Sequence, residues 1–325
     1  MNKLLTFIFL PGFVLCSFCC SARQKSAQSV GYRPKLAEIS VESLVDYQTT
    51  SVSETGNSLT TKIDDDKLYK IKLAVPIKLK GKTKMGLQLK YYRQRFNFDD
   101  DTNLGQNELF DYLSDQTFVN TGARFIYRRK KSETENISFL AGAEMRSDDH
   151  SWNSNSALYY ANATYIKNLS ATKKIGFGAY AANSLGAYSF YPLFIYESAL
   201  SKRITMELVL PKSATFRYRV NDRTFLSAKA SFRGWRYNLS HTIPDSDRAF
   251  TLRRSDAQFT LAYEREIHDW LWMGVETGYN KNLRYVMTNP GDRSRDAINT
   301  LSSKDATYLK FSIFVVPPRK LWSKI

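Results

Sequence analysis

Cysteine is confined to one short stretch of this 325-residue chain, at Cys16, Cys19 and Cys20. Every later position lacks it, which excludes disulfides, thiolate metal sites and cysteine nucleophiles from the rest of the chain. Histidine is almost as scarce. The three histidines lie far apart in the sequence, which argues against a three-histidine metal site.

Long hydrophobic runs are also missing, because no internal stretch approaches the ~18 apolar residues of a membrane-spanning helix. A polytopic helical membrane protein is therefore excluded. The first residues have a basic start at Lys3, a short apolar core and a small-residue exit at Ser21-Ala22. This pattern predicts a secretory signal peptide over residues 1–22. Lipidation at a cysteine is the less favoured alternative, because Phe18 directly precedes Cys19.

Positive charge is in excess, because the formal net charge of the chain is +16. Clustered Lys and Arg could indicate a nucleic-acid binder. Here, however, Lys70, Lys72, Lys78 and Lys80 occupy every second position of an otherwise apolar segment. Alternate side chains of a β-strand point to opposite faces, so the segment predicts a strand with one apolar and one cationic face.

The same two-residue alternation recurs to the C-terminus in runs of mostly 10–14 residues, about twice the globular mean of ~5–6. A tilted strand that crosses a bilayer needs ~9–11 residues. Short polar connections alternate with longer ones, which are expected at 50–66, 99–116, 148–156, 184–191, 239–251 and 287–304. This arrangement is typical of an outer-membrane β-barrel with periplasmic turns and extracellular loops. We expect fourteen antiparallel strands if 192–220 supplies three of them, or twelve if residues 192–203 form a loop.

The aromatic residues favour the same architecture, because they gather near both ends of the predicted strands, as the girdles at membrane interfaces do. A soluble β-sandwich is the alternative, but its strands would be shorter. Pro76 lacks the N–H that a closed barrel requires and predicts a local bulge. The expected girdle residues are Tyr127, Tyr165, Tyr196, Tyr218, Tyr263, Trp270 and Trp272 at one end and Tyr47, Tyr69, Tyr91, Tyr159, Tyr237, Tyr279 and Tyr308 at the other.

The predicted organisation has four parts. Residues 1–22 are the signal peptide and 23–35 a periplasmic segment. Residues 36–316 form the barrel, and 317–325 a periplasmic tail.

Several short motifs resemble an uncharacterised family of outer-membrane β-barrel proteins of Bacteroidetes type. They are Tyr191-Pro192-Leu193, Leu210-Pro211, Phe216-Arg217-Tyr218-Arg219 and Gly234…Tyr237. The resemblance implies a barrel in the outer membrane of a Gram-negative cell and implies no substrate. Unlike many outer-membrane proteins, the chain does not end on an aromatic residue, so the assembly signal is expected in 311–316 or at Trp322.

Candidate reactive sites are few. His150 and Ser151 could suggest an outer-membrane lipid hydrolase, but adjacent residues of a strand face opposite ways. The acidic runs 64–66 and 99–101 lack the ligand spacing of a calcium loop. Residues 106–114 predict a short amphipathic helix, which either constricts the barrel mouth or packs on its rim. We therefore expect no enzyme activity, no catalytic residue, no cofactor and no metal.

The function predicted from these features is that of a porin-like passive pore for small solutes, with a weak anion preference because more bases than acids face inward. A plugged structural or surface-interaction barrel is the alternative, and a lipid hydrolase is a second one. The expected partners are outer-membrane lipid, lipopolysaccharide, the barrel-assembly machinery and a small anionic solute, with no nucleic acid. The residues expected to line the lumen are Lys70, Lys72, Lys78, Lys90, Arg124, Arg146, Arg217, Arg219, Lys229, Arg233, Glu144 and Glu276.

Overall fold

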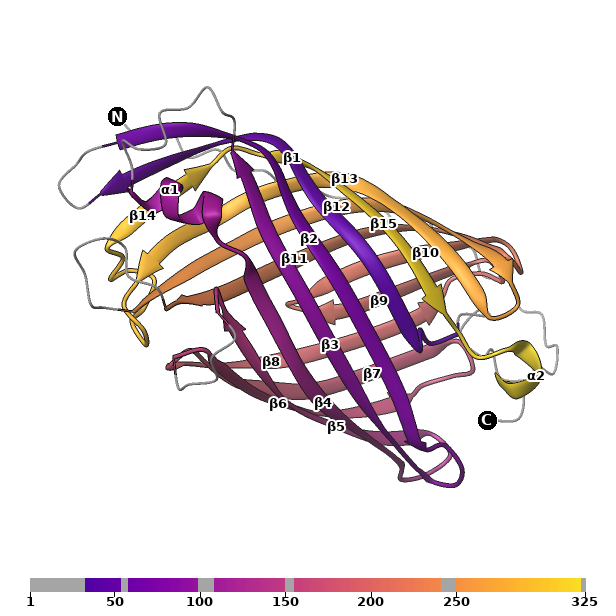
Figure 1. Ribbon diagram of the computed structural model, residues 1–325. Helices are drawn as coiled ribbons and strands as arrows, with labels where there is room; N and C mark the ends of the chain where they lie inside the picture. The colour runs from indigo at the N-terminus through magenta and orange to yellow at the C-terminus, as the bar shows by residue number, and fades with distance from the viewer. Residues whose placement is uncertain (1–32, 54–57, 99–107, 150–154, 241–248, 323–325) are drawn as a thin grey trace, which may run out of the picture.

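The computed structural model describes residues 33–53, 58–98, 108–149, 155–240 and 249–322, so the predicted signal peptide lies outside the described residues. Strands make up most of this part of the chain (Figure 1). The elements are β1 (Ala37–Ser53), β2 (Ser58–Lys78), β3 (Thr83–Phe98), α1 (Glu108–Asp115), β4 (Phe118–Lys130), β5 (Glu135–Ser147), β6 (Ala157–Asn168), β7 (Lys173–Ser184), β8 (Ala187–Ala199), β9 (Ile204–Leu210), β10 (Ser213–Asn221), β11 (Thr224–Leu239), β12 (Phe250–His268), β13 (Leu271–Thr288), β14 (Asn299–Ser303), β15 (Ala306–Val315) and α2 (Arg319–Trp322).

The sheet closes on itself. Consecutive strands from β1 to β13 pair antiparallel, and both β14 and β15 pair with β13 on one side and β1 on the other. β14 and β15 therefore share one position in the wall, interrupted at Lys304 and Asp305. The result is a closed antiparallel barrel of fourteen strands, as predicted. The twelve-stranded alternative is wrong, because residues 192–203 contribute to β8.

The alternation of side chains explains the two faces of the wall. On β2, Ile71, Leu73 and Val75 point outward and are 42–49% exposed, whereas Lys70 points inward and is 6% exposed. Strand residues two apart share a face, so each such run places an apolar stripe outside and polar groups inside. Among the described residues, neither helix is long and apolar enough to cross a membrane.

Three connections differ from the predicted ones. Residues 50–66 are mostly strand, because β1 and β2 continue as a paired ribbon. Residues 184–191 form a tight hairpin around Leu185 and Gly186, both at positive φ. Residues 287–304 contain β14. These segments are rich in Ser, Thr, Asn and Gly, so they lack the apolar alternation that marked the other strands.

The inward face changes parity within β1. Glu38 and Glu42 are buried at even positions, whereas Tyr47 and Thr49 are buried at odd ones. Tyr47 is 2% exposed and its hydroxyl accepts a hydrogen bond from Arg254. The prediction of Tyr47 in an outer girdle is therefore wrong.

Pro76 is followed by a second change of register. The pairing of β2 with β3 shifts between Pro76 and Lys78, which confirms the expected bulge. Lys78 consequently pairs with Met85, on the face of Leu87 and Leu89, and does not line the lumen.

The predicted girdles are only partly present. Tyr69, Tyr91, Tyr159 and Tyr279 are 39–51% exposed on the outer surface near the long connections. Three further aromatics assigned to the girdles, Tyr237, Tyr308 and Trp272, are at most 5% exposed and belong to the interior.

Candidate functional site

The barrel mouth, at the end with the long connections, is filled by apolar side chains. Leu109, Phe110 and Leu113 of α1 are 4%, 0% and 1% exposed. The helix therefore packs into the mouth rather than on its rim, with its apolar face toward the barrel. We call this cluster the mouth core, and its other members are Tyr47, Ile63, Phe96, Phe118, Tyr237, Leu239, Phe250, Leu252, Tyr285, Met287, Leu301 and Ala306.

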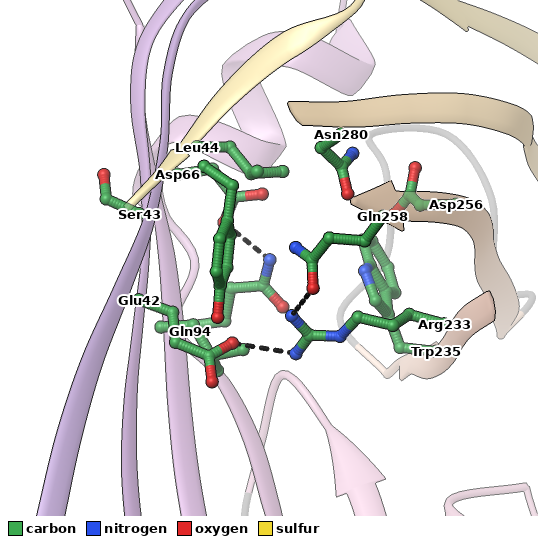
Figure 2. Close-up of a pocket in the computed structure, with 12 residues that line it drawn as sticks. Glu42, Ser43, Leu44, Asp66, Gln94, Arg233, Trp235, Asp256, Gln258 and Asn280 are labelled. Carbon is green, nitrogen blue, oxygen red and sulfur yellow. Dashed lines mark hydrogen bonds and ion pairs between the residues drawn. The ribbon is translucent and has the colours of Figure 1, made fainter. Parts of the chain in front are cut away.

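A polar layer lies in the interior beside the mouth core (Figure 2). Glu42 of β1 accepts hydrogen bonds from Lys70 Nζ at 2.5 Å and from Arg233 Nη2 at 2.8 Å. Arg233 also donates to Gln258 at 3.1 Å. Because Arg233 belongs to β11, which is not a neighbour of β1 in the sheet, the Arg233–Glu42 bond crosses the interior. The cavity beside it has a volume of only about 40 Å³. That volume holds no more than a few water molecules.

Arg254 forms a second cross-connection. Its side chain is fully buried, and it donates to Asp256 at 3.0 Å and to Asp66 of β2 at 3.4 Å. Gln94 donates to the other oxygen of Asp66 at 2.6 Å. A buried guanidinium needs such carboxylate partners, since removing it from water is costly.

A third group of charges lies on β3 and β5. Glu144 is 3% exposed, and its carboxylate forms ion pairs with Lys90 Nζ at 2.5 Å and Arg146 Nη2 at 2.7 Å. The ring of Tyr92 lies within 6 Å of the ammonium groups of Lys70 and Lys90, so it connects this group to the Glu42 layer.

The structure brings several of the predicted lumen residues together in these networks, namely Lys70, Lys90, Arg146, Arg233 and Glu144. Lys72 pairs with Glu38 at 3.2 Å. Arg217 pairs with Glu207 and Arg219 with Asp222, apart from the main network. Arg124, Lys229 and Glu276 occupy inward register positions but form no ion pair with a described residue. Lys78 lies on the outer face, as described above.

The wall has a gap on one side. β9 and β10 are only 7 and 9 residues long, so β10 covers β11 no further than Ser231 and β9 covers β8 only up to Phe194. Beyond this point β11 leans away from β8 and meets β5 at Asn238, beside Ser147. The adjoining edges of β8 and β11 are therefore separated.

A cleft of about 420 Å³ occupies this gap, and we call it the arginine cleft. One side is the inner face of β7 and β8, and the other is the upper part of β11–β13. Gly291, in the connection after β13, donates to Leu185 O at 3.1 Å and places that connection against the β7–β8 hairpin. A Cβ at Gly186 would lie 3.0 Å from Gly291 Cα, so the absence of a side chain at Gly186 permits this close approach. The described residues that line the cleft are Arg146, Leu158, Tyr180, Ala182, Ser184, Ser189, Tyr191, Gly234, Trp235, Arg236, Arg253, Arg254, Ser255, Arg284, Val286 and Ser294.

Trp235 borders both the arginine cleft and the polar cavity around Glu42. Its ring packs against Tyr237 and Tyr285 of the mouth core, with centroids 5.2 and 5.7 Å apart. The indole is thus the partition between the gap in the wall and the interior of the barrel.

Sequence reasoning missed Trp235, Arg236 and Arg253, because simple alternation places both arginines on the outer surface. One signal could have found them. An arginine that faces lipid costs ~2–4 kcal/mol at the bilayer midplane, so two outward arginines predict that this part of the wall does not face lipid.

The ends of the described chain meet at the short turns. Arg33 donates to Asp269 at 3.0 Å and to the carbonyl of Pro317 at 2.7 Å, and Arg319 bonds both Asp269 and Glu266. Burial alone would raise the pKa of Asp269. The Arg319 backbone N–H and the two guanidinium groups outweigh it and hold that pKa below its usual range.

The hydrolase and cation candidates gain no support. His150, Ser151 and the acidic run 99–101 lie outside the described residues. Asp64 pairs with Lys62 at 3.2 Å and is exposed. No group of three or more His, Cys, Asp or Glu in the described part of the chain could hold a metal ion.

The model of one protein family, described as a domain of unknown function, DUF6268, matches residues 26–314. No curated protein sequence matches the chain.

Solved structures of several outer-membrane proteins are similar at low identity. An outer-membrane channel from Pseudomonas putida F1 is 11% identical, with a TM-score of 0.42 over 90% of this chain and 100% of that one. The P. putida toluene transporter TodX is 8% identical, with a TM-score of 0.40 over 89% and 92%. A Pseudomonas aeruginosa FadL homologue is 11% identical, with a TM-score of 0.37 over 88% and 91%. At these values none of the three indicates what this chain binds.

Proposed function

The chain belongs to the DUF6268 family, and we propose that it is an outer-membrane channel for small solutes, entered through the arginine cleft and weakly selective for anions. The membrane location is supported by the wall itself. Side chains such as Leu73, Phe190 and Leu261 are 44–75% exposed on the outer surface. An apolar outer band around a polar interior suits a bilayer and is unfavourable in water.

The arginine cleft carries the proposal. The mouth core fills the straight route through the barrel end, whereas the gap between β8 and β11 leads to Trp235. Behind the indole lies the polar cavity with Arg233 and Glu42. Trp235 lines both spaces, so a rotation of its side chain would join them, and passage further into the barrel also requires the Arg233–Glu42 pair to separate.

The anion preference rests on the sign of the charges in the arginine cleft, at the entrance of this route. The cleft is lined by five arginines and, among the described residues, by no acid. Cationic groups in a low-dielectric channel raise the local concentration of anions.

The plugged barrel is the rival function, and a specific observation favours it. The bonds of Arg233 and Arg254 join strands that are not neighbours in the wall, and the cavity beside them has a volume of only about 40 Å³. In this case the outer loops, rather than a channel, would carry the function.

Recording from the purified protein in a planar bilayer separates the two. We expect brief openings in the wild type and several-fold larger currents in Trp235→Ala, because the partition is removed. Trp270→Ala, at an exposed turn position, is the matched control and should leave the current unchanged. Under a salt gradient the reversal potential should indicate anion preference. Absence of openings in both the wild type and Trp235→Ala would favour the plugged barrel.

A further inference from the structure

Two arginines of the arginine cleft are placed unfavourably against each other. Arg236 of β11 and Arg253 of β12 are directly opposite residues in the antiparallel register, so their side chains share one face. Like charges at such positions are destabilising. Arg284 of β13 lines the same cleft.

Within the described part of the chain these three arginines have no acidic partner. The hydrogen bonds that they donate there go to backbone carbonyls: Arg236 to Ser184 at 2.8 Å, Arg253 to Asp292 at 2.8 Å and Arg284 to Ser294 at 3.1 Å. None forms an ion pair with a described residue. By contrast, two other arginines of the same cleft form ion pairs. Arg146 pairs with Glu144, and Arg254 pairs with Asp66 and Asp256.

The nearby acids in the connection after β13 are engaged elsewhere. Asp292 Oδ2 accepts a hydrogen bond from Asn289 at 3.0 Å, and Asp296 pairs with Arg295 at 3.5 Å. The repulsion between Arg236 and Arg253 is therefore not relieved by the described part of the protein.

The groups around these arginines suit an oxyanion. Hydroxyl-bearing side chains of Ser189, Ser255 and Tyr191 line the cleft beside the guanidinium groups. A guanidinium presents several N–H donors in a planar fork, and each of the three keeps donors beyond the one used on a carbonyl. A dianionic phosphate has enough acceptors for several forks at once, which a single carboxylate does not.

From this geometry we infer that the arginine cleft is a binding site for a phosphate group, held by Arg236, Arg253 and Arg284. The inference rests on the proposed function, because it names the ligand class of the same cleft. The phosphate can belong to a soluble phosphorylated solute or to the headgroup of a lipid such as lipopolysaccharide. Both present the same chemistry to the arginines.

Titration calorimetry of the purified protein with inorganic phosphate, in detergent at low salt, tests the site. We expect saturable binding that weakens as salt is raised. Arg236→Gln with Arg253→Gln should weaken it about tenfold or more, since charge-assisted hydrogen bonds are lost. Arg128→Gln with Arg129→Gln, at an exposed short turn, is the matched control and should bind as the wild type does.

A second measurement excludes a folding defect. In phosphate-free buffer the Arg236→Gln, Arg253→Gln variant should resist urea at least as well as the wild type, because a like-charge pair is removed. A less stable variant would contradict the unfavourable placement on which the inference depends.

A further experiment, with lipopolysaccharide, identifies the source of the phosphate. Lipopolysaccharide retained by the wild type through detergent exchange and lost by the double variant indicates a lipid headgroup, provided that dephosphorylated lipopolysaccharide is not retained. Binding of inorganic phosphate without such retention indicates a soluble solute.

Either no phosphate binding by the wild type or equal binding by the Arg236, Arg253 variant overturns the inference. A wild type that conducts but binds no phosphate overturns this inference alone. One that binds phosphate but never conducts, even as Trp235→Ala, overturns the proposed function alone.

Discussion

Replacing Glu42 by Gln should destabilise the barrel strongly. The Glu42 side chain is 7% exposed, and its carboxylate pairs with Lys70 at 2.5 Å and Arg233 at 2.8 Å, with Lys310 at 3.7 Å. After the substitution Lys310 still pairs with Glu38 at 3.2 Å, and Arg233 still donates a hydrogen bond to Gln258. Lys70, whose side chain is also 7% exposed, is left without an ion-pair partner among the described carboxylates.

The size of the effect on the unfolding free energy depends mainly on Lys70. Removing one partner of a buried ion pair costs about 3–5 kcal/mol, because the remaining charge is buried without compensation. Since two of the three cations retain a partner, we expect the lower part of this range, about 3 kcal/mol. Replacing Lys70 by Met as well should recover part of the loss, since the unpaired ammonium is then gone.

Urea unfolding of the barrel in lipid vesicles, followed by mobility on unheated gels, measures the change. Glu133→Gln is the matched control: it breaks an ion pair of 2.6 Å with Lys130, but the Glu133 side chain is 91% exposed, so no measurable loss is expected. If Glu42→Gln were as stable as the wild type, the interior would be hydrated at Glu42 and the assignment of a dry polar layer would be wrong.

Two further substitutions test the faces of the wall and the short-turn end. Leu73→Arg should lower the unfolding free energy by ~2–4 kcal/mol if Leu73 faces the bilayer midplane. Lys72→Leu should lower it less, because Glu38 still pairs with Lys310 in that variant. The reverse ranking would mean that the register of β2 is wrong. Folding lowers the pKa of Asp269, so its carboxylate stabilises the docked C-terminal segment above the unfolded pKa of about 4 and stops doing so as pH falls through the folded value. The Arg319 amide donates to Asp269 Oδ2 at 3.0 Å, so its protection against hydrogen exchange, measured relative to the intrinsic rate at the same pH, should fall in acid. Asp269→Asn should show the lower protection already at neutral pH, and an equal rate in both proteins at neutral pH would remove Asp269 from this role.

The alternation of residues was sufficient to predict the barrel and its fourteen strands. Strand periodicity is a local property, and each of Lys70, Lys90 and Arg233 lies within an unbroken run. The pattern failed where the inward parity changes along a strand, as between Glu42 and Tyr47 and at the bulge before Lys78, because hydrophobicity alone does not mark such a change.

The arginine cleft could not be predicted for a different reason. It exists because β9 and β10 are short and because β11 meets β5 at Asn238, and this contact joins residues 91 apart in sequence. Local alternation carries no information on such a contact. The positions of Arg236 and Arg253 in the sequence did indicate that this part of the wall does not face lipid, because alternation places both arginines on the outer surface.

The most direct test of the proposed route uses the absence of cysteine after Cys20. Ser255→Cys places a single thiol in the arginine cleft, and Ser302→Cys places one on the exposed surface of β14 near the mouth. Each variant, combined with Trp235→Ala to give a measurable current, is treated with a bulky thiol reagent in the planar bilayer. Entry through the arginine cleft predicts that modification at position 255 blocks the current and that modification at 302 does not. Full current after complete modification at 255 would contradict the proposal.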